Sequence, residues 1–232
     1  MATKIIGLDL GSHTIKICEL VTTFRNLELV GFDFEKVFSG TESTNRYADQ
    51  ARAAYQLLKR RGVLGETIIC GLPSGMASTT IITLPFDQPK KIEAVLPFQL
   101  EEALPISVED VVYDYQVIGR TEEGSTEILI AYAKRSDLAE LLEALEDAGL
   151  DPKQITVGAL AIAKLHEYLA QLSLDSTVAI VDVGHRFTEL TILQDGEPRI
   201  VRNIPGGGHD INQALGTVFQ VDPSDAERGK LS

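Results

Sequence analysis

One short segment near the amino terminus combines an acid, a glycine, two hydroxyls and a lysine. It begins where an apolar, strand-like run ends at Asp9-Leu10-Gly11. A glycine in a tight turn lets backbone N–H groups face an anion without interference from a Cβ atom. Ser12 and Thr14 could donate hydrogen bonds to phosphate oxygens. Lys16 could neutralise the phosphate, and Asp9 could hold a hydrated Mg²⁺ ion. The candidate ligand-binding residues of this first loop are Asp9, Gly11, Ser12, His13, Thr14 and Lys16.

A second segment, far along the chain, repeats this pattern. Asp182-Val183-Gly184 also follows an apolar, strand-like run, so Asp182 and Gly184 correspond to Asp9 and Gly11. Asp182 could supply a second carboxylate for Mg²⁺ beside Asp9. Glu189 stands where the first loop has Lys16, so this second loop is not a second lysine clamp. Either motif alone fits an ordinary β-turn, but their duplication predicts two similar halves that face one another across a cleft.

Several residues near the second loop leave alternatives open. Arg186 could contact phosphate or lie in solvent, and His185 has no partner motif and is assigned no role. Gly206-Gly207-Gly208 precedes a predicted helix, so Gly207 could present its N–H group to an anion or belong to a flexible turn. The histidines lack metal-ligand spacing. The segment around Ser74, Gly-Leu-Pro-Ser-Gly, is not the nucleophile elbow of a serine hydrolase.

The composition excludes several classes of protein. The net charge of −13 over 232 residues argues against binding to nucleic acid or to an anionic lipid surface, because both need clustered lysine and arginine. No signal peptide is recognised, and no apolar stretch approaches the roughly 20 residues needed to span a bilayer. Cys18 and Cys70 lie in apolar, strand-like runs and are expected to be buried, reduced thiols. The chain is therefore expected to be a soluble cytoplasmic protein.

Short strands and one compact insertion must position these loops. Apolar alternation and turn residues predict the same three-strand unit twice, with the dipeptide Asp195-Gly196 as a hairpin turn in the second copy. Between the two copies, residues 88–150 read as helix, strand, strand and helix, which is consistent with a separate subdomain. The strands of the two copies are predicted at 4–10, 14–21 and 27–34, and at 177–183, 187–194 and 197–203.

The order of motifs resembles a known family. The paired loops are similar to the phosphate 1 and phosphate 2 loops of the actin, Hsp70 and sugar-kinase ATPase superfamily. The middle of the chain resembles the inserted 1C subdomain of the PilM family, the actin-like assembly proteins of type IV pili, and the related cytoplasmic domain of GspL. Ala226-Glu227-x-x-Lys230 is similar to the segment that contacts the nucleoside ribose in FtsA-like proteins. The middle segments that carry the resemblance are Leu84-Pro85-Phe86, Ile92–Glu101, Leu104-Pro105-Ile106, Asp114–Val117 and Leu145–Pro152.

The resemblance implies an α/β fold, the actin-like (ribonuclease H-like) ATPase fold. It implies subdomain 1A at 1–87, a 1C-like subdomain at 88–152, a return to 1A at 153–174 and an incomplete 2A at 175–232. A full PilM-like chain continues into subdomain 2B and a Gly-Gly adenosine motif, so the chain is expected to be a truncated or shortened form. ATP and Mg²⁺ are implied for the full-length protein, with Glu227 and Lys230 among its nucleotide contacts, and no bound cofactor for this fragment.

The resemblance also implies a scaffold rather than an enzyme, without catalytic residues. It would lie at the cytoplasmic face of the inner membrane in a type IV pilus or type II secretion system. The implied partners are an inner-membrane PilN-like or GspM-like protein, a GspE-like or PilB-like ATPase, and a second copy of the chain. A sugar-kinase-like phosphotransferase or nucleotide hydrolase is the alternative, although phosphoryl transfer needs a base and no candidate for it stands out in the sequence. An FtsA-like division protein is a third possibility.

Overall fold

The first half of the chain is built on a five-stranded sheet. Its strands β1, β2 and β3 pair in antiparallel fashion, whereas β4 pairs parallel with β1, and β8 parallel with β4. The computed structural model describes residues 3–24, 26–37, 45–169 and 177–231. In order across the sheet, the strands are β3 (Leu27–Lys36), β2 (Thr14–Thr22), β1 (Thr3–Leu10), β4 (Thr67–Leu72) and β8 (Gln154–Val157).

One face of this sheet is covered by helix α1 (Arg46–Arg61). Alternate residues of β1, such as Ile6 and Leu8, are buried against α1, while Asp9 points to the opposite face. The α1 helix begins at Asn45, whose side chain accepts a hydrogen bond from the Ala48 N–H group. It ends at Gly62, where a φ of 71° suits a residue without a Cβ.

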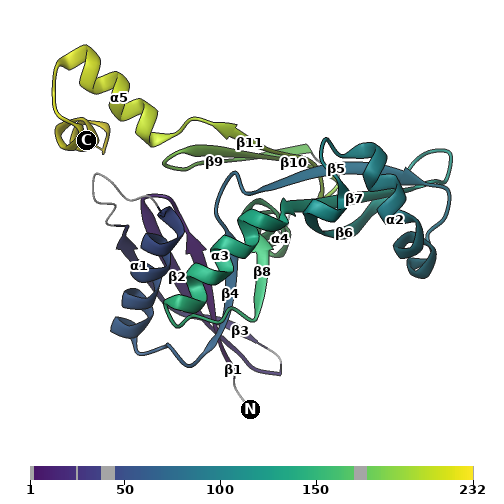
Figure 1. Ribbon diagram of the computed structural model, residues 1–232, viewed down its shortest axis with the longest axis horizontal. Coiled ribbons are helices and arrows are strands. Elements are labelled where there is room, and N and C mark those ends of the chain that lie inside the picture. The colour runs from purple at the N-terminus through teal and green to yellow at the C-terminus, as the bar shows by residue number, and fades with distance from the viewer. Residues whose placement is uncertain (1–2, 25, 38–44, 170–176, 232) are drawn as a thin grey trace.

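Helix α3 (Arg135–Asp147) also packs on the first sheet. The sequence places this helix in the inserted 1C-like subdomain, at 88–152. Its apolar residues Leu141 and Leu145 instead belong to the same core as Ile6 and Leu57. Figure 1 shows α3 beside α1, across the strands of the first sheet. The 3–4 spacing of its leucines predicts that the helix has an apolar face, but it does not predict which element that face packs against.

The second sheet is three-stranded and antiparallel, with β5 and β6 on either side of β7. The sequence places the β5 segment in subdomain 1A, at 1–87, but its hydrogen bonds are with β7. Strand alternation predicts a strand without naming its partner, so the sequence did not indicate this pairing. Helix α2 packs on this sheet through Ile92, Leu96 and Leu100, which form a second core with the strands. The elements are β5 (Ala77–Leu84), α2 (Pro89–Ala103), the 3₁₀ turn η1 (Val108–Asp110), β6 (Val111–Arg120) and β7 (Thr126–Lys134).

The third sheet repeats the opening three strands, as the sequence predicts. It comprises β9 (Thr177–Val183), β10 (Phe187–Gln194) and β11 (Glu197–Pro205), in the antiparallel order β11-β10-β9. Asp195 and Gly196 both have positive φ, at 55° and 80°, as the predicted hairpin turn requires. The helices of this half are α4 (Gly158–Leu169), α5 (Gly208–Phe219) and α6 (Pro223–Leu231). The predicted boundary between residues 174 and 175 lies outside the described residues.

The second and third sheets are joined directly, through β5 and β11. The Asn203 side chain donates a hydrogen bond to the Ala77 carbonyl at 2.8 Å, and the Thr79 hydroxyl donates to the Val201 carbonyl at 3.2 Å. Figure 1 shows the two sheets side by side, above the first sheet. The inserted unit therefore contacts the second half of the chain as well as the first.

Two smaller predictions can be compared with the structure. Both cysteines are free: Cys70 is buried, as predicted, whereas Cys18 is only partly buried, because it lies on the face of the first sheet opposite α1. Burial raises the pKa of Cys70 to about 12, with a further contribution from the charge of Asp9, so its thiol is protonated.

Within the described residues, no helix is both long and apolar enough to cross a membrane.

Candidate functional site: the cleft between the two loops

The two predicted loops have the same local geometry. The first joins β1 to β2 and the second joins β9 to β10. A Cβ atom on Gly11 would lie 2.4 Å from the Thr14 carbonyl oxygen, and one on Gly184 would lie 2.8 Å from that of Phe187. Each turn is therefore too tight for any residue except glycine. From α1, the Gln50 amide donates hydrogen bonds to the carbonyls of Leu10 and Gly11, so the helix holds the first loop in place.

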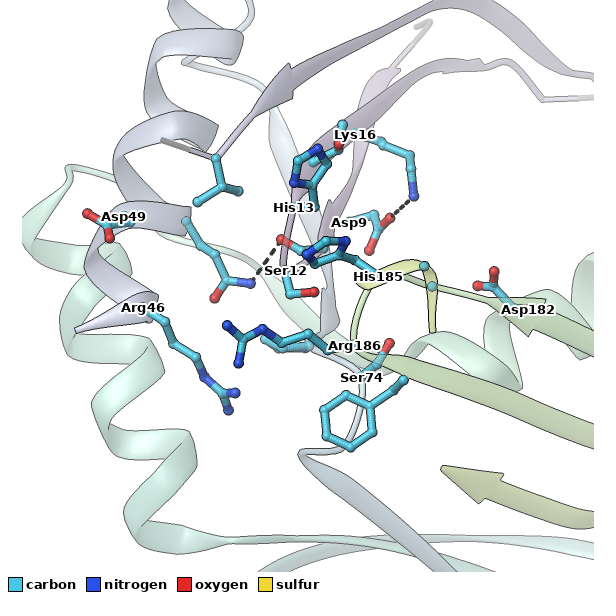
Figure 2. Close-up of a pocket in the computed structure, with 18 of the residues that line it drawn as sticks. Asp9, Ser12, His13, Lys16, Arg46, Asp49, Ser74, Asp182, His185 and Arg186 are labelled. Carbon is cyan, nitrogen blue, oxygen red and sulfur yellow. Dashed lines mark hydrogen bonds and ion pairs between the residues drawn. The ribbon is translucent and has the colours of Figure 1, made fainter. Parts of the chain in front are cut away.

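Both loops open into one cleft of about 1280 Å³. This volume is ample for a nucleotide-sized ligand. Figure 2 shows the loops facing one another, with Arg186 extending toward the wall formed by α1. Of the eleven nucleotide-binding residues predicted from the sequence, all except Gly207 line this cleft: Asp9, Gly11, Ser12, His13, Thr14, Lys16, Asp182, Gly184, Glu227 and Lys230.

Lys16 forms an ion pair with Asp9, and the charge of Asp182 also acts on it. Its ammonium group donates a hydrogen bond to Asp9 at 2.9 Å. Burial would lower the pKa of Lys16, but its hydrogen bond to Asp9 and the charges of Asp9 and Asp182 outweigh burial and raise the pKa above its usual value. Both carboxylates therefore act on a single cation, in the arrangement that a Mg²⁺ ion bound to phosphate prefers. In the described ranges, no group of three acidic, histidine or cysteine side chains could hold a metal. A Mg²⁺ ion would therefore rely on these two carboxylates and on the phosphate to which it is bound.

A third carboxylate, Glu189, lies behind this pair. Glu189 is directly opposite Asp182 in the β9–β10 ladder and is only 9% exposed. Burial raises its pKa, and the charges of Asp182 and Asp9 raise it further, although a hydrogen bond with Ser74 opposes them. The sequence comparison of the two loops identified Glu189 as the counterpart of Lys16, but it gave no indication that the carboxylate would be buried.

The carboxy-terminal pair Glu227 and Lys230 forms the far side of the cleft. The two side chains are joined by an ion pair of 2.6 Å, and the Asn212 amide also donates to Glu227, at 2.5 Å. These hydrogen bonds, first from Lys230 and then from Asn212, lower the pKa of Glu227, so it carries a negative charge at neutral pH. The two residues lie on one face of α6, as their spacing of three predicts.

Gly207 has a different role from the one predicted. Its N–H group donates to the Asp210 carboxylate at 2.9 Å and does not face the cleft. The N–H groups of Gly208 and His209 donate to the carbonyls of Gly184 and His185, both at 2.8 Å. A Cβ atom on Gly207 would lie 2.4 Å from the Gly184 carbonyl oxygen. The glycines therefore allow α5 to pack against the second loop, and hydrogen bonds within the protein use the N–H groups that were expected to bind an anion.

Three histidines meet at the cleft, which the sequence did not predict. The rings of His13 and His185 are stacked, with centroids 4.6 Å apart, and His209 meets His185 edge-on at 5.3 Å. Figure 2 shows His13 and His185 adjacent between the two loops. Their positions in the two turns were visible in the sequence, but their contact depends on how the halves are oriented. His185, to which the sequence assigned no role, thus links the two loops.

Two halves with matching strand–turn–strand loops around one cleft define a protein of the actin-like ATPase fold. Comparison with known sequences is more specific, because the profile of the type IV pilus assembly protein PilM family matches residues 7–232. The chain therefore belongs to the PilM family.

Solved structures agree with this fold. A chain of the PilM–PilN type IV pilus biogenesis complex matches with a TM-score of 0.82 and 23% identity, over 98% of this chain and 69% of that one. The cytoplasmic domain of EpsL, an inner-membrane component of the type II secretion system of Vibrio cholerae, matches with a TM-score of 0.56 and 14% identity, over 95% and 78%. A Bacteroides thetaiotaomicron protein with an actin-like ATPase fold matches with a TM-score of 0.51 and 10% identity, over 94% and 76%.

Proposed function

We propose that this chain is a scaffold at the cytoplasmic face of the inner membrane that docks the cytoplasmic tail of a PilN-like membrane protein. The observation that carries the proposal is the family match over residues 7–232, together with the fold shared with a chain of the PilM–PilN complex. The same platform would engage a PilB-like or GspE-like ATPase.

The inserted unit supports a docking role. Its outer strand β6 exposes Val112 and Val117, and its helix α2 exposes Phe98 at 73%. An extended peptide can add its backbone hydrogen bonds to a free strand edge and place its apolar side chains in neighbouring pockets. Exposed apolar groups on a unit with its own core are suited to a peptide partner of this kind.

The cleft adds a nucleotide site to this scaffold. Lys16, with the carboxylates of Asp9 and Asp182, would bind Mg²⁺ and the phosphates of ATP between the two loops. Glu227 and Lys230, on the opposite side, would contact the sugar. In this proposal ATP is a bound structural ligand without significant turnover.

Calorimetric titration of the chain with a synthetic peptide tests the docking. The peptide covers the amino-terminal cytoplasmic tail of the PilN-like protein from the same genome. We expect saturable binding that a scrambled peptide does not show, and weaker binding by Phe98→Ser. The matched control is Phe24→Ser, which removes a fully exposed phenylalanine from the distant β2–β3 turn. Absence of binding by the native peptide would overturn the docking proposal.

One observation favours the alternative enzymatic reading. Glu189 is a buried carboxylate beside the two loops, and burial raises its pKa, which is a feature of carboxylates that act as general bases. A phosphate-release assay with ATP and Mg²⁺ separates the two readings. Turnover that is far above background and is abolished by Glu189→Gln would replace the scaffold with a hydrolase.

A further inference from the structure

The histidines of this chain are concentrated at one point of the cleft. The chain has four histidines, and three of them, His13, His185 and His209, form a continuous ring cluster. They come from three separate segments: the first loop, the second loop and the start of α5. The stack of His13 on His185 therefore bridges the two loops where a bound phosphate chain would lie.

Two cations, Arg186 and Lys230, and the imidazoles of His13 and His209 act on His185. Burial lowers the pKa of His185 to about 4, and the neighbouring His13 and His209 and the charges of Arg186 and Lys230 contribute to this shift. His185 is therefore neutral at pH 7 in the ligand-free protein. The charges of Arg186 and Lys230 and the neighbouring His13 and His209 thus disfavour protonation of His185. An anion bound beside His185 would favour its protonation.

Negative groups also line the cleft, and several of them are already engaged by other residues. Glu227 is engaged by Lys230 and Asn212. Asp9 is engaged by Lys16, and Asp182 lies at the end of β9 within reach of the same lysine. On the opposite wall, the charged residues that line the cleft from α1 and α3 are Arg46, Asp49, Asp137 and Glu140.

We propose that the histidine cluster couples anion binding to proton uptake, so that a polyphosphate group bound between the two loops is held together with a proton on His185. The proton comes from solvent and is shared with the bound phosphate oxygens as a charge-assisted hydrogen bond. This inference rests on the proposed nucleotide site. The polyphosphate group could belong to a nucleoside triphosphate or to inorganic tripolyphosphate.

Linkage gives the inference a measurable form. If the ligand raises the proton affinity of His185, then a fall in pH must raise the affinity for the ligand by the same coupling. At pH values between the pKa of His185 in the free protein and its pKa in the complex, lowering the pH by one unit lowers the dissociation constant of the ligand by up to about tenfold. The ligand's own protonation contributes equally to the native chain and to a His185 variant, so their difference isolates the histidine.

The test is titration calorimetry of the full chain at pH 6 and pH 7, with ATP and with tripolyphosphate, in two buffers of different ionisation enthalpy such as PIPES and Tris. The dependence of the observed enthalpy on the buffer gives the number of protons taken up. We expect the native chain to take up a substantial fraction of one proton more than His185→Asn. The matched control is His166→Asn, since His166 is the one histidine outside the ring cluster, and it should behave like the native chain.

The outcomes separate this inference from the proposed function. Binding with equal proton uptake by the native chain and His185→Asn would overturn the inference and leave the nucleotide site intact. Absence of binding by both ligands would overturn the nucleotide site and the inference with it, without affecting peptide docking. Uptake with ATP but not with tripolyphosphate would support the inference and identify a nucleotide as the source of the phosphates.

A second measurement uses the native chain alone and so does not depend on the folding of a variant. The ring C–H resonances of the histidines are followed by NMR as a function of pH, with and without tripolyphosphate. We expect one cleft histidine to titrate at a higher pH when the ligand is present. Identical titration curves with saturating ligand would refute the coupling.

Discussion

Glu189 lies directly opposite Asp182 in the β9–β10 ladder, in the position that Lys16 occupies opposite Asp9 in the β1–β2 ladder. The duplicated loops thus carry an ion pair in one half and two carboxylates in the other. Like charges directly opposite one another destabilise a sheet. Because Glu189 is buried, solvent does not screen its charge. The two halves therefore differ in charge balance although their strand–turn–strand backbones are alike.

Glu189→Gln should stabilise the chain at neutral pH. The substitution keeps an acceptor for Ser74 and removes the repulsion, which should raise the free energy of unfolding by roughly 0.2–1 kcal/mol. Because the pKa of Glu189 is raised in the folded state, the native chain loses stability as pH rises from the usual value of 4.5 through the raised value. Urea unfolding between pH 4 and pH 8 should show this loss in the native chain and not in the variant. A variant less stable than the native chain at pH 7 would contradict the repulsion.

Lys16→Ala should weaken any binding of ATP by the chain. Removal of a charged hydrogen-bond donor beside the phosphates corresponds to a loss of roughly 10- to 100-fold in affinity. It also leaves Asp9 without its ion-pair partner. Calorimetry with ATP and Mg²⁺ measures the loss, and Lys164→Ala is the control because Lys164 forms an exposed ion pair on α4 outside the cleft. Unchanged affinity in Lys16→Ala would show that the first loop is no longer a phosphate site.

Gly207→Ala should separate α5 from the second loop. The added Cβ would lie 2.4 Å from the Gly184 carbonyl oxygen, so backbone must shift and hydrogen bonds from the start of α5 are strained. Forced overpacking of this kind lowers the free energy of unfolding by roughly 1–3 kcal/mol. The measurement is urea unfolding, with Gly65→Ala as the control because nothing lies within 4 Å of a Cβ atom there. Equal stability of the two variants would show that the loops do not pack as described.

Glu19 should make the first sheet sensitive to acid. Glu19 is 4% exposed and accepts hydrogen bonds from Lys4 at 3.2 Å and from Arg61 at 2.8 Å. Burial would raise its pKa, but these two hydrogen bonds and the charges of both partners outweigh burial and lower the pKa below 4.5. The stability that Glu19 contributes is therefore complete above pH 4.5 and is lost as pH falls through the lowered value.

Glu19→Gln tests this contribution. We expect a loss of about 1–3 kcal/mol at pH 7, less than for a fully buried pair, because Lys4 and Arg61 remain about one-third exposed. The loss should shrink as pH falls through the lowered pKa of Glu19, because the native carboxyl is then itself protonated. Thermal unfolding across this pH range measures it, and Glu167→Gln, in an exposed ion pair, serves as the control. A loss that does not change with pH would point to packing and not to charge.

Much of the candidate site followed from local sequence patterns. Asp9 and Asp182 were identified because a duplicated acidic turn after an apolar strand is a short-range signal, and ten of the eleven predicted residues line the cleft. Gly207 was identified for the wrong reason. Its neighbours in sequence indicated an anion-binding helix start, whereas the packing partner that decides its role, the Gly184 carbonyl, lies in another loop.

The amino-acid sequence by itself determined the duplicated strand–turn–strand units, the hairpin turn at Asp195-Gly196 and the membership of the PilM family, since each depends on neighbouring residues or on the order of motifs. Tertiary structure alone decided that β5 pairs with β7, that α3 packs beside α1 and that His13 stacks on His185. Periodicity reports that a strand or helix has an apolar face, but many apolar faces are physically equivalent partners. Only the packing of the whole chain selects among them, and so the charges and rings that meet across the cleft appear only once the two halves are placed.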